Sequence, residues 1–171
     1  VFLAAAQRCL QDDPSLRFVI PAANETRKSQ IESLLSGLNH RHCFILLDGQ
    51  SHAAMQAAEL IVMASGTATL EALLLQRPMI VAYKMSWGTW QLARRLVKVP
   101  YISLPNLLAG EGLVPELLQD EASVERVAQE MSQALASPAR QQELQARFRD
   151  IHKTLRRDAD TSAARAIAEL L

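Results

Sequence analysis

The sequence predicts an open α/β fold, in which a parallel sheet carries helices on both of its faces. Up to about residue 107, short apolar runs alternate with longer stretches of helical periodicity. The apolar runs are continuous rather than alternating in polarity, which is typical of strands that are buried on both faces. Beyond residue 107 only the helical periodicity continues, so a helical C-terminal segment is expected after the sheet.

The apolar runs are the expected strands. Each run is bounded by residues that favour a turn, such as Pro21, Gly49, Gly66 and Pro105. Strands and helices in alternation are typical of a parallel sheet, because parallel strands need a crossover connection. The runs cover residues 17–20, 43–47, 60–63, 79–83 and 101–104.

Helical periodicity and capping residues locate the expected helices. Ser123 is placed to cap one helix, and Pro138 fits the first position of the next, where an N–H group would be unpaired in any residue. The opening residues share an apolar face at helical spacing, and a chain that begins inside a helix is expected to be part of a longer protein. The expected helices cover residues 2–10, 24–38, 51–58, 67–76, 87–97, 123–136, 138–155 and 159–171.

Composition restricts the class of protein. The chain has 171 residues, a length suited to one domain, and 49% of them are hydrophobic and 21% charged. Lys and Arg number 18, as do Asp and Glu, so no excess of positive charge would recruit nucleic acid or an anionic membrane. No apolar stretch of the sequence is long enough to span a bilayer. Cys9 and Cys43 lie beside apolar residues and are interpreted as reduced core thiols, with a disulfide bridge between them as the alternative.

The most informative candidate site follows the expected strand 60–63. Ligands of open parallel sheets bind outside the carboxyl ends of the strands, and here Ser65, Gly66 and Thr67 lead directly into a helix. A glycine lets the backbone approach a ligand, and the free N–H groups at a helix start favour an anion such as phosphate. Glu71 lies one helical turn further on, where a carboxylate can accept hydrogen bonds from ribose hydroxyls. The alternative is an ordinary capped helix with Glu71 in solvent.

Two further residues are expected at the same edge of the sheet. Leu47 ends the strand 43–47. Asn106 follows the strand 101–104 and offers an amide that both donates and accepts hydrogen bonds. The alternative for Asn106 is a turn residue that bonds its own backbone.

The sequence carries no recognisable metal site or common catalytic motif. His40 and His42 have no cysteine or carboxylate partner at a zinc spacing, and the Walker, GxGxxG and GxSxG motifs are absent. The helix 87–97 combines Trp87 and Trp90 with basic residues. We expect this helix to pack against the core with a solvated cationic edge, and a membrane-surface helix is the alternative.

Four segments form an ordered set of motifs: ASGTATLE at 64–71, MIVAYKM at 79–85, VPYISLPNLLAG at 99–110 and VPELLQ at 114–119. Together they resemble the lipid-A-disaccharide synthase family, and the match runs from about Phe18 to the C-terminus. The run LPNLLAG is specific to that family. Ser-Gly-Thr followed by Glu is shared more widely among two-domain glycosyltransferases of the GT-B fold.

The resemblance implies that residues 1–171 are one C-terminal domain, a Rossmann-like half of a GT-B enzyme that binds UDP-sugar and lacks the N-terminal acceptor domain. It implies transfer of 2,3-diacylglucosamine from UDP to 2,3-diacylglucosamine 1-phosphate with inversion, which gives the β-1,6-linked lipid A disaccharide. It places the protein in the cytoplasm of a Gram-negative bacterium, peripherally on the inner face of the cytoplasmic membrane. It implies no cofactor, metal or nucleic acid, and it leaves a homodimer open. The isolated chain is expected to be inactive, because the general base of this family belongs to the N-terminal half.

The resemblance also implies roles for individual residues. The Ser-Gly-Thr run would face the diphosphate, Glu71 would hold the ribose, and Leu47 would meet uracil through its backbone. Asn106 would orient the donor in catalysis, with Gln119 nearby. The residues implied to bind UDP are Leu47, Ser65, Gly66, Thr67, Glu71, Asn106 and Gln119.

Two departures from the family pattern stand out. Glu111 follows Gly110 where the family usually has arginine, and residues 86–90 differ from the more usual proline-containing version. Two alternatives to the implied function remain open. One is another UDP-sugar enzyme of the same fold, such as a UDP-N-acetylglucosamine epimerase or the peptidoglycan glycosyltransferase. The other is a non-enzymatic nucleotide-binding module.

Overall fold

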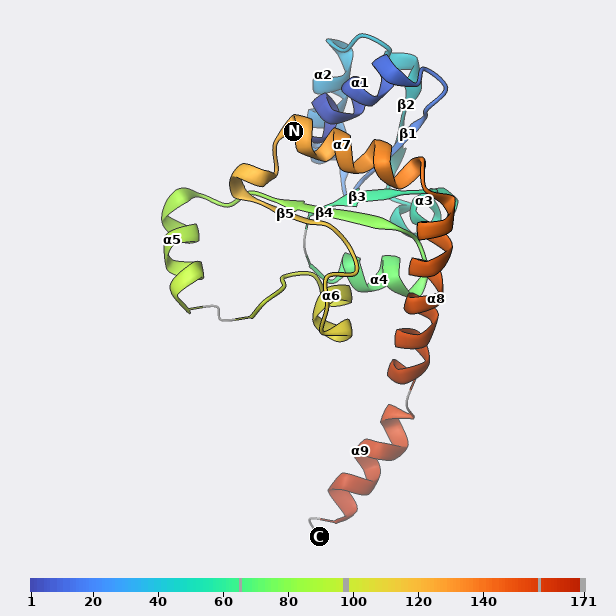
Figure 1. The fold of residues 1–171 in the computed structure, drawn as a ribbon, viewed down its shortest axis with the longest axis vertical. Helices are drawn as coiled ribbons and strands as arrows, with labels where there is room; N and C mark the ends of the chain where they lie inside the picture. Colours follow the sequence, from blue (N-terminus) through green and yellow to red (C-terminus); the bar gives the residue numbers. More distant parts are fainter. Residues whose placement is uncertain (65, 97–98, 157, 170–171) are drawn as a thin grey trace.

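Among the described residues, the strands are parallel and lie in two sheets (Figure 1). The computed structural model describes the chain apart from residues 65, 97–98, 157 and 170–171, and also leaves the side chains of 92–98, 159 and 162 undescribed. The expected α/β fold with parallel strands is confirmed, but the expected single sheet is divided, because within the described residues β1 and β3 form no ladder with each other. One sheet has the order β1-β2 and the other the order β3-β4-β5. The strands are β1 (Phe18–Ala22), β2 (Phe44–Asp48), β3 (Ile61–Met63), β4 (Met79–Tyr83) and β5 (Glu116–Leu118).

The proline in β1 fits its position at the edge of the two-stranded sheet. The Ala22 carbonyl accepts a hydrogen bond of 2.8 Å from the Gly49 N–H, so it points toward the β2 side. Backbone groups of successive strand residues point to opposite sides. The nitrogen of Pro21 therefore faces the other edge of β1, where its lack of a hydrogen costs no ladder bond.

The expected strand 101–104 is wrong. The chain is irregular there, and the helix α6 (Leu104–Ala109) begins at the last of these residues. Pro105 lies in the first turn of α6, where its fixed φ and missing N–H suit a helix start. The fifth strand is instead β5, at residues 116–118, beyond the point where strands were expected to stop.

The other expected helices are present, with ends that shift by a few residues. The Asn24 side chain accepts a hydrogen bond from the Arg27 N–H at 3.0 Å, and the Ser123 hydroxyl accepts one from the Arg126 N–H at 3.1 Å, so both cap their helices. Pro138 opens its helix as predicted. The helices are α1 (Phe2–Asp12), α2 (Glu25–Ser36), α3 (Ser51–Ala57), α4 (Ala68–Leu74), α5 (Trp87–Leu96), α6 (Leu104–Ala109), α7 (Val124–Leu135), α8 (Pro138–Leu155) and α9 (Ala159–Ala168).

Helices cover both faces of the three-stranded sheet, as the continuous apolar runs predict. On one face, Ile80 and Ala82 of β4 pack against α1 and α7, and on the other, Met79 and Val81 pack against α4 and α8. Figure 1 shows α7 and α4 on opposite sides of this sheet. A further cluster joins α1 and α2 to the β1-β2 sheet. Side chains fully buried in these clusters include Ala5, Leu35, Ala72, Leu73, Val127 and Phe148.

Both cysteines are buried and neither forms a disulfide, which agrees with their interpretation as core thiols. Burial raises the pKa of the Cys9 thiol, and a weaker opposing effect comes from its contact with Ser132.

Among the described residues, no helix has both the length and the apolar character needed to cross a membrane.

Candidate functional site

The loop after β3 brings Gly66 and Thr67 to the carboxyl end of the sheet and leads into α4. Gly66 has φ +132°, a conformation that side chains other than glycine rarely adopt, and a Cβ there would meet no atom within 4 Å. The turn is closed by the buried Thr69, whose hydroxyl donates to the Gly66 carbonyl at 2.7 Å. Thr67 occupies the N-cap position but makes no capping hydrogen bond through its side chain. Ser65, the remaining residue of this predicted site, lies outside the described residues.

Glu71 lies on the same exposed side of α4. The Glu71 N–H donates to the Thr67 carbonyl at 3.3 Å, so the two residues are one helical turn apart. Both side chains are exposed. The structure therefore brings Gly66, Thr67 and Glu71 together on one accessible surface, as predicted from their spacing.

Asn106 is placed differently, because its side chain is 1% exposed and hydrogen-bonded within the protein. Its Nδ2 donates to the Val114 carbonyl and to Glu116 Oε1, each at 2.9 Å, and its Oδ1 accepts from the Val114 N–H at 2.9 Å. Both polar atoms of this α6 side chain are thus hydrogen-bonded within the protein. It holds the segment around Val114 rather than its own turn.

Gln119 also binds the protein's own backbone. Its Oε1 accepts a hydrogen bond from the Met85 N–H at 2.9 Å, and its Nε2 donates to the Met85 carbonyl at 3.3 Å. The backbone of Gln119 has φ +53°, in the left-handed region. The side chain thereby ties the end of β5 to the segment that leaves β4.

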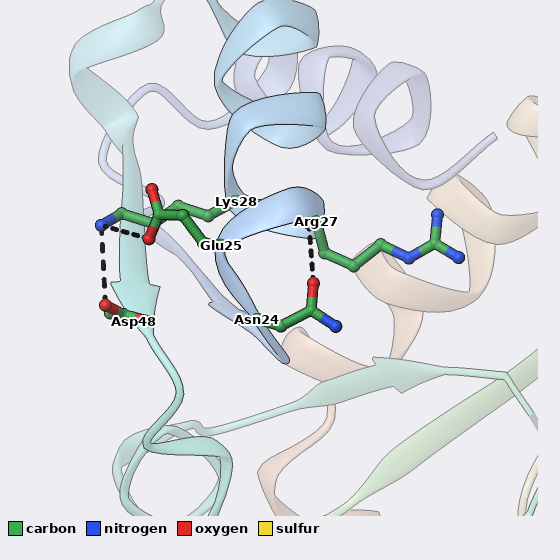
Figure 2. Close-up of polar contacts among 5 residues, drawn as sticks. All are labelled: Asn24, Glu25, Arg27, Lys28 and Asp48. Atoms are coloured by element: carbon green, nitrogen blue, oxygen red, sulfur yellow. Dashed lines mark hydrogen bonds and ion pairs between the residues drawn. The ribbon is translucent and has the colours of Figure 1, made fainter.

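Leu47 lies in the two-stranded sheet, whereas the Gly66 loop follows the three-stranded one. It is half-buried near the end of β2. The neighbouring Asp48 pairs with Lys28 of α2 at 3.7 Å, and Lys28 also pairs with Glu25 at 3.6 Å (Figure 2). The Lys28 ammonium is therefore shared by two carboxylates at this end of the sheet.

Glu116 is the polar residue that the sequence analysis missed. Its carboxylate accepts hydrogen bonds from the N–H groups of Ile102 and Ser103, at 2.8 and 2.9 Å, and from the Ser103 hydroxyl at 2.6 Å. The Asn106 amide is a fourth donor. The signal in the sequence was a carboxylate at the start of the apolar run Glu-Leu-Leu, which follows Pro115 directly.

Glu111, which stands where the family usually has arginine, forms an ion pair with Arg147 of α8. Both side chains are about half exposed, at 54% and 51%. Ion pairs of this kind contribute about 0–1 kcal/mol, so this one does little to stabilise the loop. It does bring an arginine beside the end of α6.

The helix α5 departs from expectation at Trp87, whose side chain is 76% exposed. The prediction that this helix packs against the core is therefore wrong for that residue. The cationic residues expected on its edge lie in the part of the helix whose side chains are not described.

Two hollows of the described residues lie away from the Gly66 loop. A cavity of about 40 Å³ sits between α7, α8 and the start of β4, and an open groove runs between α1 and α7. Among the described residues, no three or more His, Cys, Asp or Glu side chains gather as a metal site.

A parallel α/β domain with an exposed glycine loop between a strand and a helix is typical of proteins that bind phosphorylated ligands at that edge. A sequence model of the family described as Lipid-A-disaccharide synthetase matches residues 1–169. The chain therefore belongs to the lipid-A-disaccharide synthetase family. Over all 171 residues it is 52% identical to the lipid-A-disaccharide synthase of Pseudomonas putida strain F1 and 49% identical to that of Pseudomonas aeruginosa strain PAO1. It spans 44% of the length of each of these relatives.

Proposed function

We propose that this chain is the donor-binding half of a lipid-A-disaccharide synthase. The complete protein would transfer 2,3-diacylglucosamine from UDP to 2,3-diacylglucosamine 1-phosphate with inversion and form the β-1,6-linked disaccharide. The observation that carries the proposal is the exposed surface of Gly66, Thr67 and Glu71 at the carboxyl end of β3, in a chain that belongs to this family.

The Gly66 loop is proposed to hold the diphosphate of the donor. The backbone at Gly66 is unobstructed by any Cβ, and the Thr67 hydroxyl is not used as a helix cap. Neither the Gly66 N–H nor the Thr67 hydroxyl donates to another described residue, so both are proposed to donate to phosphate oxygens. Each bond to a charged acceptor contributes about 1.5–3 kcal/mol. Ser65 is proposed as a second hydroxyl donor.

Glu71 is proposed to accept hydrogen bonds from the two ribose hydroxyls, and Leu47 to contact uracil through its backbone. Asn106 is proposed to act on the donor through the loop that it holds, because both polar atoms of its amide are already bonded. Gln119 is proposed to contribute in the same indirect way.

Catalysis is proposed to require the rest of the protein. An inverting transfer needs a base at the acceptor hydroxyl, on the face opposite the leaving UDP. We assign the base and the acceptor site to the part of the complete protein outside this chain, so the chain alone would bind UDP without turnover. The complete protein is proposed to work as a cytoplasmic, peripheral enzyme at the inner face of the cytoplasmic membrane, with a homodimer as a further proposal.

The ribose contact provides the sharpest test. Glu71→Ala should weaken the binding of UDP by about ten-fold or more, because bonds to a charged acceptor are lost. The same substitution should leave the binding of 2′,3′-dideoxy-UDP nearly unchanged. Glu143→Ala, which removes an exposed carboxylate on α8, is the matched control. Calorimetric titration of the complete protein and of each variant measures the affinity for UDP and for 2′,3′-dideoxy-UDP.

Each outcome decides a different point. Equal losses for the two nucleotides would show that Glu71 does not contact the ribose. A protein that binds UDP but makes no disaccharide from the two lipid substrates would favour another UDP-sugar enzyme or a non-enzymatic binding module. Turnover by the isolated chain would refute the proposed division between the two halves.

A further inference from the structure

The segment between β4 and α6 leaves the sheet at Tyr83 and returns at Leu104, and it carries α5. We call this segment, which is described apart from residues 97–98, the α5 excursion. Figure 1 shows α5, drawn in yellow-green, standing to one side of the three-stranded sheet. Because Trp87 is mostly exposed, the first turn of α5 gains little from apolar burial. The contacts at the two ends of the excursion therefore matter for its position.

The first end is held by Gln119. Its side-chain amide makes a pair of hydrogen bonds with the backbone of Met85, one accepted at 2.9 Å and one donated at 3.3 Å. This is the pairing that a neighbouring strand would make. Gln119 adopts a left-handed φ of +53°, which a residue other than glycine maintains only where surrounding contacts compensate for it.

The second end is held by Glu116. Its carboxylate accepts hydrogen bonds from the N–H groups of Ile102 and Ser103 and from the Ser103 hydroxyl. The next N–H group, that of Leu104, is 3.4 Å from the hydroxyl oxygen of Thr69. Three successive backbone donors, the last of them in the first residue of α6, are thus satisfied by side chains from elsewhere in the fold.

The contact through Thr69 extends to the Gly66 loop. The Thr69 hydroxyl donates to the Gly66 carbonyl while its oxygen accepts from Leu104, so one buried side chain joins the glycine loop to the start of α6. Glu116 lies opposite Val81 in the sheet, and Val81 lies opposite Met63, shortly before the Gly66 loop. Glu116 is therefore placed to hold the start of α6 and the Gly66 loop at one level of the three-stranded sheet.

We propose that Glu116 and Gln119 are positioning residues, which hold the two ends of the α5 excursion to the sheet. Through Thr69, Glu116 also fixes the Gly66 loop. The second statement rests on the proposed function, since it gives Glu116 an effect on sugar-nucleotide affinity without contact to the ligand. Gln119 holds the other end of the excursion, at Met85, and its positioning effect is therefore measured at that end.

Amide hydrogen exchange in the complete protein tests the positioning itself. Gln119→Ala should speed exchange at Met85 by about ten-fold, and Glu116→Ala should do so at Ile102 and Ser103, because each loses the partner of those N–H groups. Should Glu116→Ala fail to fold, Glu116→Gln keeps the shape and one acceptor oxygen and should give a smaller change at the same amides. The matched controls, Gln142→Ala and Glu125→Gln, alter exposed residues of α8 and α7 and should change neither end. Unchanged exchange at these amides, or a uniform rise across the protein, would overturn the proposal.

Calorimetric titration with UDP then tests the link to the Gly66 loop. We expect Glu116→Ala to raise the Kd by about ten-fold, Glu116→Gln to restore part of the affinity, and the control Glu125→Gln to leave it within about two-fold. If Glu116→Ala speeds exchange at Ile102 and Ser103 but leaves the Kd unchanged, the link is refuted. If the unaltered protein does not bind UDP, the proposed function fails, and the exchange measurement still decides whether the two residues hold the excursion.

Discussion

Replacing Asn106 by alanine removes a buried amide that binds three groups, and the size of the effect follows from what is left behind. The Val114 N–H and carbonyl lose their partners, and both belong to a residue that is 4% exposed. A buried polar group without a partner costs about 1–3 kcal/mol, so the two together cost about 2–6 kcal/mol. Glu116 loses one of its four donors but keeps those of Ile102 and Ser103.

Urea unfolding followed by circular dichroism measures this loss in the free energy of unfolding. Asn39→Ala is the matched control because Asn39 is exposed, and we expect it to change stability by no more than about 0.5 kcal/mol. Asn106→Asp should be at least as harmful as Asn106→Ala, because it places a second carboxylate beside Glu116. A loss below about 1 kcal/mol for Asn106→Ala would refute the structural role described here.

Three other substitutions test separate features. Gly66→Ala should destabilise the protein by about 1–3 kcal/mol and weaken UDP binding, because a φ of +132° strains any residue with a Cβ; unchanged unfolding would contradict this conformation. Phe148→Ala should cost about 3–5 kcal/mol in unfolding, since this ring is fully buried between α8 and the sheet, and a cost near zero would mean that α8 packs otherwise. Burial raises the pKa of the Cys9 thiol above its ordinary value of 9.0, so the folded state holds this proton more tightly than the unfolded state. This contribution to the free energy of unfolding is present below pH 9.0 and is lost as the pH rises further. The difference in the free energy of unfolding between about pH 8 and about pH 10 should therefore be smaller in Cys9→Ala than in the unaltered protein.

The sequence predicted most of the fold because its apolar runs and capping residues act locally. The strand at Met79–Tyr83 and the helix at Pro138–Leu155 were located at their observed ends. The prediction of a strand at 101–104 was wrong because a short apolar run before a proline is equally compatible with an irregular segment followed by a helix start. The strand Glu116–Leu118 was missed because three residues, one of them charged, give no periodic signal.

Some residues of the candidate site could be located from the sequence, and the contacts of others could not. Gly66, Thr67 and Glu71 could be grouped from spacing alone, because a helix fixes which residues share a face. Asn106 and Gln119 were expected at a ligand, but their partners are the backbones of Val114 and Met85. Such contacts depend on how distant segments pack, which spacing along the chain does not specify.

The central claim is that this chain supplies the sugar-nucleotide site at the carboxyl end of β3. The most direct test is an NMR titration with UDP. The complete protein is labelled with ¹⁵N at glycine and threonine for this measurement. We predict that the Gly66 and Thr67 amides shift most, that Glu71→Ala abolishes most of this shift at the same UDP concentration, and that Glu143→Ala does not. Shifts that spare Gly66 and Thr67, or no shift under saturating UDP, would contradict the claim.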